Sequence, residues 1–261
     1  MPDHVDTTLT GAVARVTLHR PNLHNAFNDD VIAEISTAFK EAGENNDVRV
    51  VVLCSEGKSF CAGADVNWMR RMVEYSFEDN VADALRLSNM LRTIRECPKP
   101  VIARVHGTCI GGGVGLAAAC DVVASVKSAV FSLSEVKLGI APAVISPFVT
   151  ERLGPGAMRR YALTAERFDA DEARRIGLVD EVFETVDALD AWIDATCRAI
   201  LGNGPRAVAA CKRILSTVAG ADWDHLQTVT ARTIAELRAS PEGQDGLRAF
   251  LEKRKPGWVS D

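Results

Sequence analysis

The chain has 261 residues, of which 47% are hydrophobic, and this is enough for one sizeable core with a small appended region. A formal net charge of -5 argues against a nucleic-acid binder that relies on a basic face. No apolar stretch is long enough to span a bilayer, and the polar, acidic residues 1–6 do not resemble a signal peptide. We therefore expect a cytoplasmic protein that binds neither nucleic acid nor membrane.

Alternating apolar and polar residues predict a strand over 12–19. Asn28 begins a helix whose apolar residues recur at helical spacing as far as Ala42. The continuous apolar run 49–54 is typical of a strand buried on both faces. The order strand, helix, strand favours an α/β fold with a crossover helix.

The charged segment 67–74 fits either a flap over a pocket or an ordinary surface helix. A linker at 202–205 divides residues 1–201, which we expect to form the core, from residues 202–261. Further strands are predicted over 101–105, 121–125, 129–132 and 178–183. Helices are predicted over 81–94, 114–120, 145–153, 157–163, 169–176, 186–201, 205–218, 223–239 and 241–253.

Seven cysteines are present, an odd number, and no two of them are separated by only two residues. Most have apolar or small neighbours, so we expect reduced and mostly buried thiols. The five histidines do not have the spacing of metal ligands. We therefore predict no metal site.

Two turns rich in small residues follow predicted buried strands. Glycines 111–113 open one helix, and residues 61–64 open another. A helix N-terminus leaves backbone N–H groups unpaired, and these can hold an anion or a developing oxyanion. Because neighbouring parallel strands end on the same side of a sheet, both turns can present a donor to one ligand oxygen. The alternative is that both are ordinary turns that pack a helix closely on the sheet.

Glu135 is a candidate acid or base. It lies among apolar side chains in a stretch that ends with Gly139. Burial there would raise the pKa of its carboxyl group, as acid–base chemistry requires. The alternative is a solvated loop residue.

Several motifs occur in an order that is specific to one family. The chain resembles the enoyl-CoA hydratase/isomerase family, also called the crotonases, over nearly its whole length. The motifs that carry the resemblance are Arg20-Pro-x-x-x-Asn25-Ala26, Ser59-Phe-Cys-Ala-Gly-Ala-Asp65, Lys99-Pro-Val-Ile-Ala-Arg-Val-His-Gly107, Gly111-Gly-Gly113, Ala119-Cys-Asp121, Glu135 with Leu138-Gly139, Leu163-Thr-Ala-Glu166, Ala173-x-x-x-Gly-Leu-Val179 and Phe250-Leu-Glu-Lys-Arg254. The resemblance implies an α/β fold, namely a spiral of β–β–α units followed by a helical C-terminal region, residues 202–261, that forms homotrimers or hexamers.

The resemblance also implies an enolate formed on an acyl-CoA thioester. The N–H groups of Ala64 and Gly112 would hold the thioester oxygen, and Glu135 would exchange the proton. Coenzyme A is part of the substrate, so no separate cofactor is expected. The implied substrate-binding residues are Asn25, Ala26, Ala62, Gly63, Asp65, Gly115, Phe250 and Lys253.

The sequence differs from the family pattern at one position that affects the predicted reaction. Two-glutamate hydratases of the family carry a glutamate where this chain has Gly115, a gap that would leave room for a bulkier acyl branch or a water. Residues 134–147 resemble those of hydratases that act on branched, methylglutaconyl-type acyl-CoAs in leucine breakdown. We therefore predict an enoyl-CoA hydratase. The alternatives are a double-bond isomerase that needs only Glu135, and a non-catalytic acyl-CoA-binding protein.

Overall fold

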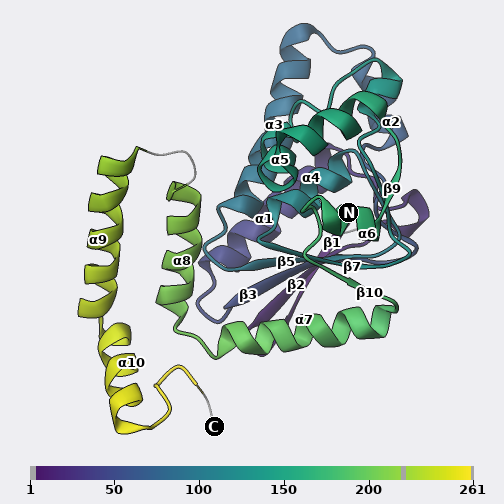
Figure 1. Ribbon diagram of the computed structural model, residues 1–261. Coiled ribbons are helices and arrows are strands. Elements are labelled where there is room, and N and C mark those ends of the chain that lie inside the picture. The colour runs from purple at the N-terminus through teal and green to yellow at the C-terminus, as the bar shows by residue number, and fades with distance from the viewer. Residues whose placement is uncertain (1–3, 219–221, 260–261) are drawn as a thin grey trace.

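A six-stranded sheet runs through the body of the computed structural model, which describes residues 4–218 and 222–259 (Figure 1). β1 is antiparallel to its neighbour, and the other strands are parallel. In spatial order they are β1 (Val5–Thr10), β2 (Val13–Leu18), β3 (Val50–Ser55), β5 (Val101–Val105), β7 (Val122–Val126) and β10 (Glu181–Phe183). β3 is buried along its whole length, as its apolar run predicted.

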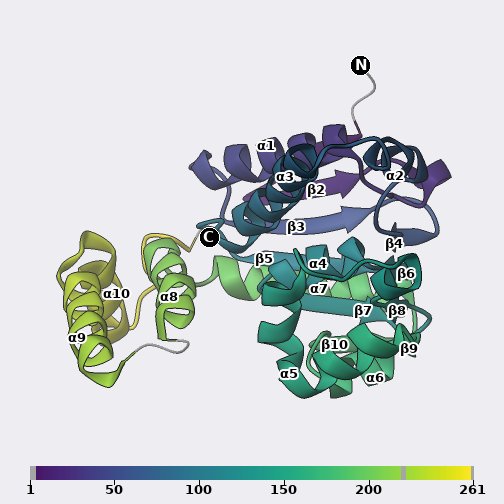
Figure 2. The same ribbon diagram turned by 90° about the horizontal axis from the view of Figure 1, so that it is seen from above.

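A second sheet of four short strands lies beyond the ends of the first (Figure 2). Its strands, in spatial order, are β4 (Ser59–Cys61), β6 (Thr108–Ile110), β8 (Val130–Ser132) and β9 (Phe168–Asp169). β4, β6 and β8 each follow a long strand of the first sheet in the chain, and β4 and β6 are each followed by a helix. This repeat confirms the expected spiral of β–β–α units.

Helices cover both faces of the large sheet. α1 and α3 lie on one face and α7 lies on the other (Figure 1). α1 begins at the predicted position because the side chain of Asn28 accepts a hydrogen bond from the N–H of Val31. The helices of the body are α1 (Asp29–Glu44), α2 (Val66–Met72), α3 (Phe77–Arg95), α4 (Gly112–Ala119), α5 (Ser146–Thr164), α6 (Ala170–Arg175) and α7 (Val186–Leu201), with 3-10 turns η1 (Pro21–Leu23) and η2 (Glu135–Leu138).

The predicted helices 145–153 and 157–163 form one kinked helix, α5. Gly154 has a φ of 73° and a ψ of 163°, which no α-helix contains. The backbone therefore leaves the helical conformation at this one residue before Pro155 and then resumes it.

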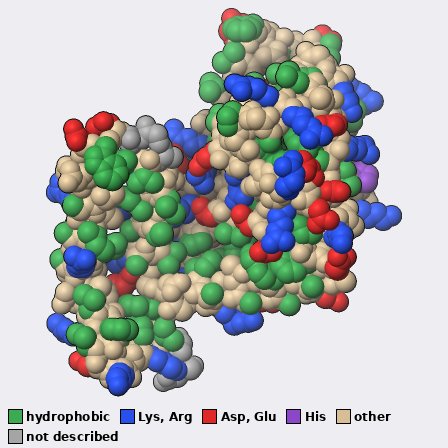
Figure 3. All heavy atoms as spheres, in the orientation of Figure 1, with side chains coloured by type: hydrophobic (Ala, Val, Ile, Leu, Met, Phe, Trp, Pro, Cys, Tyr) green, Lys and Arg blue, Asp and Glu red, His purple; other side chains and the backbone are tan. Residues whose placement is uncertain are grey.

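Three further helices form an arm that extends away from the body (Figures 1 and 2). They are α8 (Pro205–Val218), α9 (Trp223–Ala239) and α10 (Pro241–Glu252). Lys212 joins the arm to the body, since its ammonium group lies 2.7 Å from Asp121 and 3.1 Å from the carbonyl oxygen of Lys99. Apolar side chains are exposed along the arm (Figure 3), including Trp223 and Leu251. No described helix is long and apolar enough to cross a membrane.

Candidate active site

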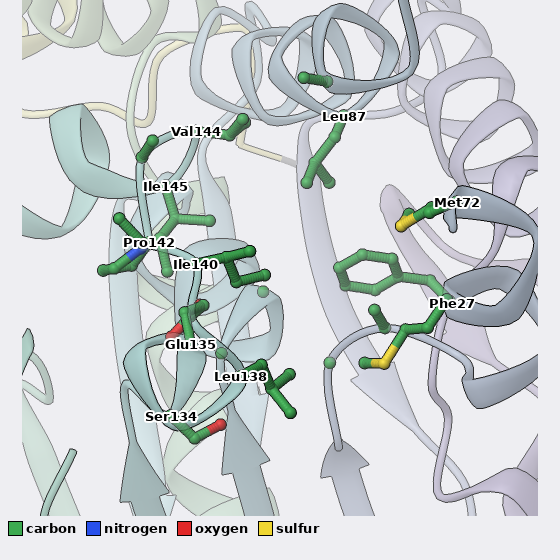
Figure 4. A pocket seen from close by; sticks show the side chains of 18 of the residues that line it. Phe27, Met72, Leu87, Ser134, Glu135, Leu138, Ile140, Pro142, Val144 and Ile145 are labelled. Atoms are coloured by element: carbon green, nitrogen blue, oxygen red, sulfur yellow. The ribbon is translucent and has the colours of Figure 1, made fainter. Parts of the chain in front are cut away.

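A cavity of about 280 Å³ opens between α2, α3, η2 and the loop that leads into α5. Figure 4 shows Glu135 and Pro142 on one side of it and Phe27 and Met72 on the other. Most of its lining is apolar, and its polar side chains are Asn80, Asp83, Ser134 and Glu135. Among the described residues no Lys, Arg or His lines it, and none form a cluster that could hold a metal ion.

Two of the three glycines of the first turn, Gly112 and Gly113, approach another group too closely for a side chain. A Cβ at Gly112 would lie 2.2 Å from Cζ of Phe27, and one at Gly113 would lie 2.4 Å from the carbonyl oxygen of Cys61. A Cβ at Gly111 would lie 3.2 Å from Oε1 of Glu135. The turn therefore brings the start of α4 against both walls of the cavity. The N–H of Gly112 donates no hydrogen bond to any described residue.

The second turn lies beside the first. Ala62, Gly63 and Ala64 line the cavity, and a Cβ at Gly63 would lie only 3.7 Å from the backbone nitrogen of Gly112. Phe27 donates its N–H to the carbonyl of Gly63 and accepts the N–H of Asp65. The N–H of Ala64, between these two bonds, has no acceptor within the described part of the chain. Two free N–H groups thus reach one cavity.

Glu135 begins η2 and is half-buried beside Gly111. Burial raises the pKa of its carboxyl group above the usual value, and the hydrogen bond from its own N–H only partly opposes this. Its Oε2 is buried and has no hydrogen-bond partner among the described residues. A carboxyl group with a raised pKa and a free oxygen is suited to giving and taking a proton.

Gly115 is not among the residues that line the cavity, and its role in substrate binding stays a prediction. Gly115 is buried in α4 and does not line the cavity. A Cβ there would lie 2.4 Å from Cγ2 of Ile145. The side chain of Ile145 therefore fills the space that was expected to hold an acyl branch or a water.

Asn25, Ala26 and Asp65 hold the second turn in place, and their contact with the coenzyme A part of the substrate stays a prediction. The amide of Asn25 donates to the carbonyls of Glu56 and Ser59, both at 2.7 Å, and accepts the N–H of Arg20. Arg20 also donates to Asp65 at 2.9 Å and to the carbonyl of Ala26 at 2.6 Å. Asp65 caps α2 through the N–H of Asn67. All three predicted residues are buried and lie outside the cavity.

Phe250 and Lys253 also lie away from the cavity. Phe250 is on α10, with 83% of its surface exposed, and Lys253 ends that helix. The fold of one chain therefore does not bring either residue to Glu135.

The cavity residues that the sequence analysis did not name include Trp68 and Asp83. Trp68 of α2 is only 2% exposed, and its ring lies 6.1 Å from that of Phe27, so α2 packs against the cavity wall. Asp83 of α3 lines the cavity and is 5% exposed. Asp83 precedes Leu87 by one helical turn, so it lies on the apolar face of the predicted helix. A charged residue on such a face was the feature of the sequence from which Asp83 could have been found.

The spiral of β–β–α units and two free N–H groups beside a carboxyl group define a crotonase-type fold and site. The family pattern described as enoyl-CoA hydratase/isomerase matches residues 8–261. The chain belongs to this family.

Relatives and solved structures are similar to this chain over nearly its whole length. The short-chain-enoyl-CoA hydratase of Clostridium acetobutylicum is 34% identical over 94% of this chain and 93% of its own. A peroxisomal Delta(3,5)-Delta(2,4)-dienoyl-CoA isomerase of Arabidopsis thaliana is 33% identical over 94% and 92%. The crystal structure of an enoyl-CoA hydratase from Shewanella pealeana is 41% identical, with a TM-score of 0.94, over 98% of this chain and 96% of that chain.

Proposed function

We propose that the protein is an enoyl-CoA hydratase, which reversibly adds water across the 2,3-double bond of an acyl-CoA. The observation that carries this proposal is the meeting of three groups at one cavity: the free N–H groups of Ala64 and Gly112, and the partly buried carboxyl group of Glu135. Relatives named as hydratases support the same reaction.

The proposed chemistry is an enolate held by two hydrogen bonds. When water attacks C3 of the acyl group, negative charge moves to the thioester oxygen. Fixed donors such as the N–H groups of Ala64 and Gly112 stabilise that charge, because they need no reorganisation as it develops. Burial keeps more of Glu135 protonated near neutral pH, so Glu135 can donate the proton that C2 receives.

The charges of the residues that line the cavity indicate which kind of acyl group it accepts. A methylglutaconyl-type group carries a second carboxylate, and no cationic side chain among the described cavity residues would pair with it. The carboxylate of Asp83, which also lines the cavity, would instead repel it. We therefore propose a short, neutral acyl group in place of the carboxylated, branched one.

A double-bond isomerase is the second candidate, and the filled space at Gly115 favours it. Isomerisation moves a proton between C2 and C4 and requires only one carboxyl group. Incubation with a 2-enoyl-CoA and with a 3-enoyl-CoA separates the candidates. We expect the enoyl absorbance of the 2-enoyl-CoA to fall as water adds. Appearance of that absorbance from the 3-isomer, with no hydration, would favour the isomerase, and no turnover of either would favour a non-catalytic binding protein.

We further propose that the protein assembles into trimers or hexamers through the arm. The exposed apolar side chains of α9 and α10, among them Trp223, Phe250 and Leu251, would then be covered by other copies. Phe250 and Lys253 would approach coenzyme A on an adjoining subunit. Light scattering at micromolar concentration tests the assembly, and a monomer would contradict both statements.

A further inference from the structure

Helix α3 brings a second carboxylate to the cavity. The side chain of Asp83 is buried, and its Oδ1 accepts a hydrogen bond from Nη2 of Arg86 at 2.8 Å. No hydrogen bond from any described residue reaches its other oxygen. Figure 4 shows Leu87, one turn further along α3, pointing into the cavity, and residues four apart share a face of a helix. Asp83 and Leu87 both line this cavity.

The oxygen of Asp83 that accepts no hydrogen bond is accessible, because it is not one of the fully buried polar atoms that lack a partner among the described residues. Arg86 supplies one hydrogen bond, but its own side chain is 53% exposed and is therefore well solvated. A ligand or water in the cavity would complete the hydrogen bonding of Asp83.

Hydration requires two proton transfers, and Glu135 alone does not account for both at once. One group must take a proton from the attacking water while another gives a proton to C2. Ile145 fills the space next to Gly115, so this position offers no second acid. Among the described residues that line the cavity, Asp83 and Glu135 are the two carboxylic acids.

We propose that Asp83 is a second catalytic residue, the base that takes a proton from the attacking water. The assignment rests on the proposed hydratase function. The water O–H bond breaks and its proton moves to the free oxygen of Asp83, while the water oxygen bonds to C3. The π electrons of the C2–C3 bond move to the thioester oxygen. The O–H bond of Glu135 then breaks as its proton moves to C2, and the proton on Asp83 returns to Glu135 through water.

The cavity has room for this arrangement. A single water needs roughly 10–15 Å³ of cavity, and its polar partners must converge on it. The cavity of about 280 Å³ therefore has room for a short acyl group together with a water.

The test separates hydration from proton exchange at C2. Crotonyl-CoA reports hydration, which needs both carboxylates in this proposal. Butyryl-CoA in D2O exchanges its C2 protons for deuterium, which needs Glu135 and the two N–H groups but not Asp83, and mass spectrometry follows the exchange. The variants are Asp83→Asn and Glu135→Gln. Glu78→Gln, an exposed carboxylate in the first turn of α3, is the matched control. Asp83→Ser is measured alongside in case Asp83→Asn does not fold.

We expect Asp83→Asn to lower kcat for hydration by about 10²- to 10⁴-fold, the usual contribution of general acid–base catalysis, and to retain exchange within a few-fold. Glu135→Gln should lose both reactions, and Glu78→Gln neither. Hydration at the wild-type rate in the Asp83 variants would overturn the proposal, and so would loss of both reactions, which would indicate a structural role. If the wild-type protein exchanges C2 protons but hydrates no 2-enoyl-CoA, the hydratase function fails, and the assignment of Asp83 fails with it.

Discussion

The side chain of Ile145 occupies the space that any side chain at Gly115 would need. The two residues are 30 positions apart in the chain, and a Cβ on Gly115 would lie 2.4 Å from Cγ2 and 2.9 Å from Cβ of Ile145. The wall between α4 and the loop before α5 is therefore closed by one aliphatic side chain. Neither a carboxylate nor a water can take this position while Ile145 remains.

Gly115→Ala should therefore destabilise the protein. Forcing a methyl group into a packed core costs about 1–3 kcal/mol of unfolding free energy. Adding Ile145→Ala should recover part of that loss, so the double variant should be more stable than the sum of the single changes predicts. Urea unfolding gives the unfolding free energies of the wild type, the two single variants and the double variant. Gly156→Ala is the control, because nothing lies within 4 Å of a Cβ there. If the changes in unfolding free energy of the two single variants simply add in the double variant, the side chains at positions 115 and 145 do not meet.

Gly112 and Gly113 should respond differently to alanine. At Gly113 the new methyl group would meet the backbone carbonyl of Cys61, which cannot move aside, so Gly113→Ala should greatly reduce the yield of folded protein. At Gly112 it would meet the ring of Phe27, and Phe27→Leu should relieve the overlap. Thermal unfolding should therefore show rescue in the Gly112→Ala, Phe27→Leu double variant.

The same double variant should remain poorly active, because the methyl group still stands beside the N–H that we propose holds the thioester oxygen. Loss of one such donor costs about 10²- to 10³-fold in kcat. Full recovery of kcat together with stability would contradict the assignment of the Gly112 N–H as an oxyanion donor.

Glu135→Gln should lower kcat by at least about 10²-fold and leave binding of acyl-CoA nearly intact. Glutamine keeps the shape of glutamate but does not exchange a proton at neutral pH. Stopped-flow turnover and calorimetric binding of a saturated acyl-CoA measure the two quantities. A kcat close to that of the wild type would show that another group supplies the proton.

The same variant should change how stability depends on pH. The pKa of Glu135 is raised in the folded state, above its ordinary value of 4.5. Between these two pKa values the folded state holds a proton that the unfolded chain releases, so the free energy of unfolding falls as pH rises through this window. Glutamine does not titrate. The Tm of Glu135→Gln relative to wild type should therefore rise between pH 4 and pH 8, and a constant difference would contradict the burial of this carboxyl group.

One thiol of the seven should react quickly with a thiol reagent in the folded protein. Six cysteines are buried, and Cys211 on α8 is exposed. Burial raises the pKa of Cys61 and of Cys120 to about 12, which leaves almost no reactive thiolate at neutral pH. Absorbance titration should count one fast thiol in buffer and seven in denaturant, and Cys211→Ser should remove the fast one. Additional fast thiols would show that the core opens.

Periodicity predicted the long elements well, because each buries a continuous face. The run 49–54 became β3, and the helical spacing after Asn28 became α1. Strands β4 and β6 were missed, since three residues are too few to show a period of two. β1 was missed because five of its six residues are exposed, so no alternation marks it.

The site was only partly predictable for a related reason. The turns at Gly63 and Gly112 were visible as clusters of small residues, and their closeness followed from parallel strands. The contact between Gly115 and Ile145 is purely tertiary, so a single sequence carries no sign of it. Asn25 and Asp65 matched family motifs, but the motifs did not show that both side chains hold the loop beside the second turn through hydrogen bonds.

Phe27 touches both turns: its backbone pairs with residues on either side of Ala64, and its ring lies against Gly112. The two free N–H groups, of Ala64 and Gly112, thus come from segments that are far apart in the chain and meet only after the N-terminal loop has docked. A refolding chain that has its helices and its large sheet still lacks the two aligned N–H groups. Enzymatic turnover is consequently a reporter of the last tertiary steps of folding. In a refolding experiment it should return after the far-UV circular dichroism signal, and partly folded chains should contribute none of it.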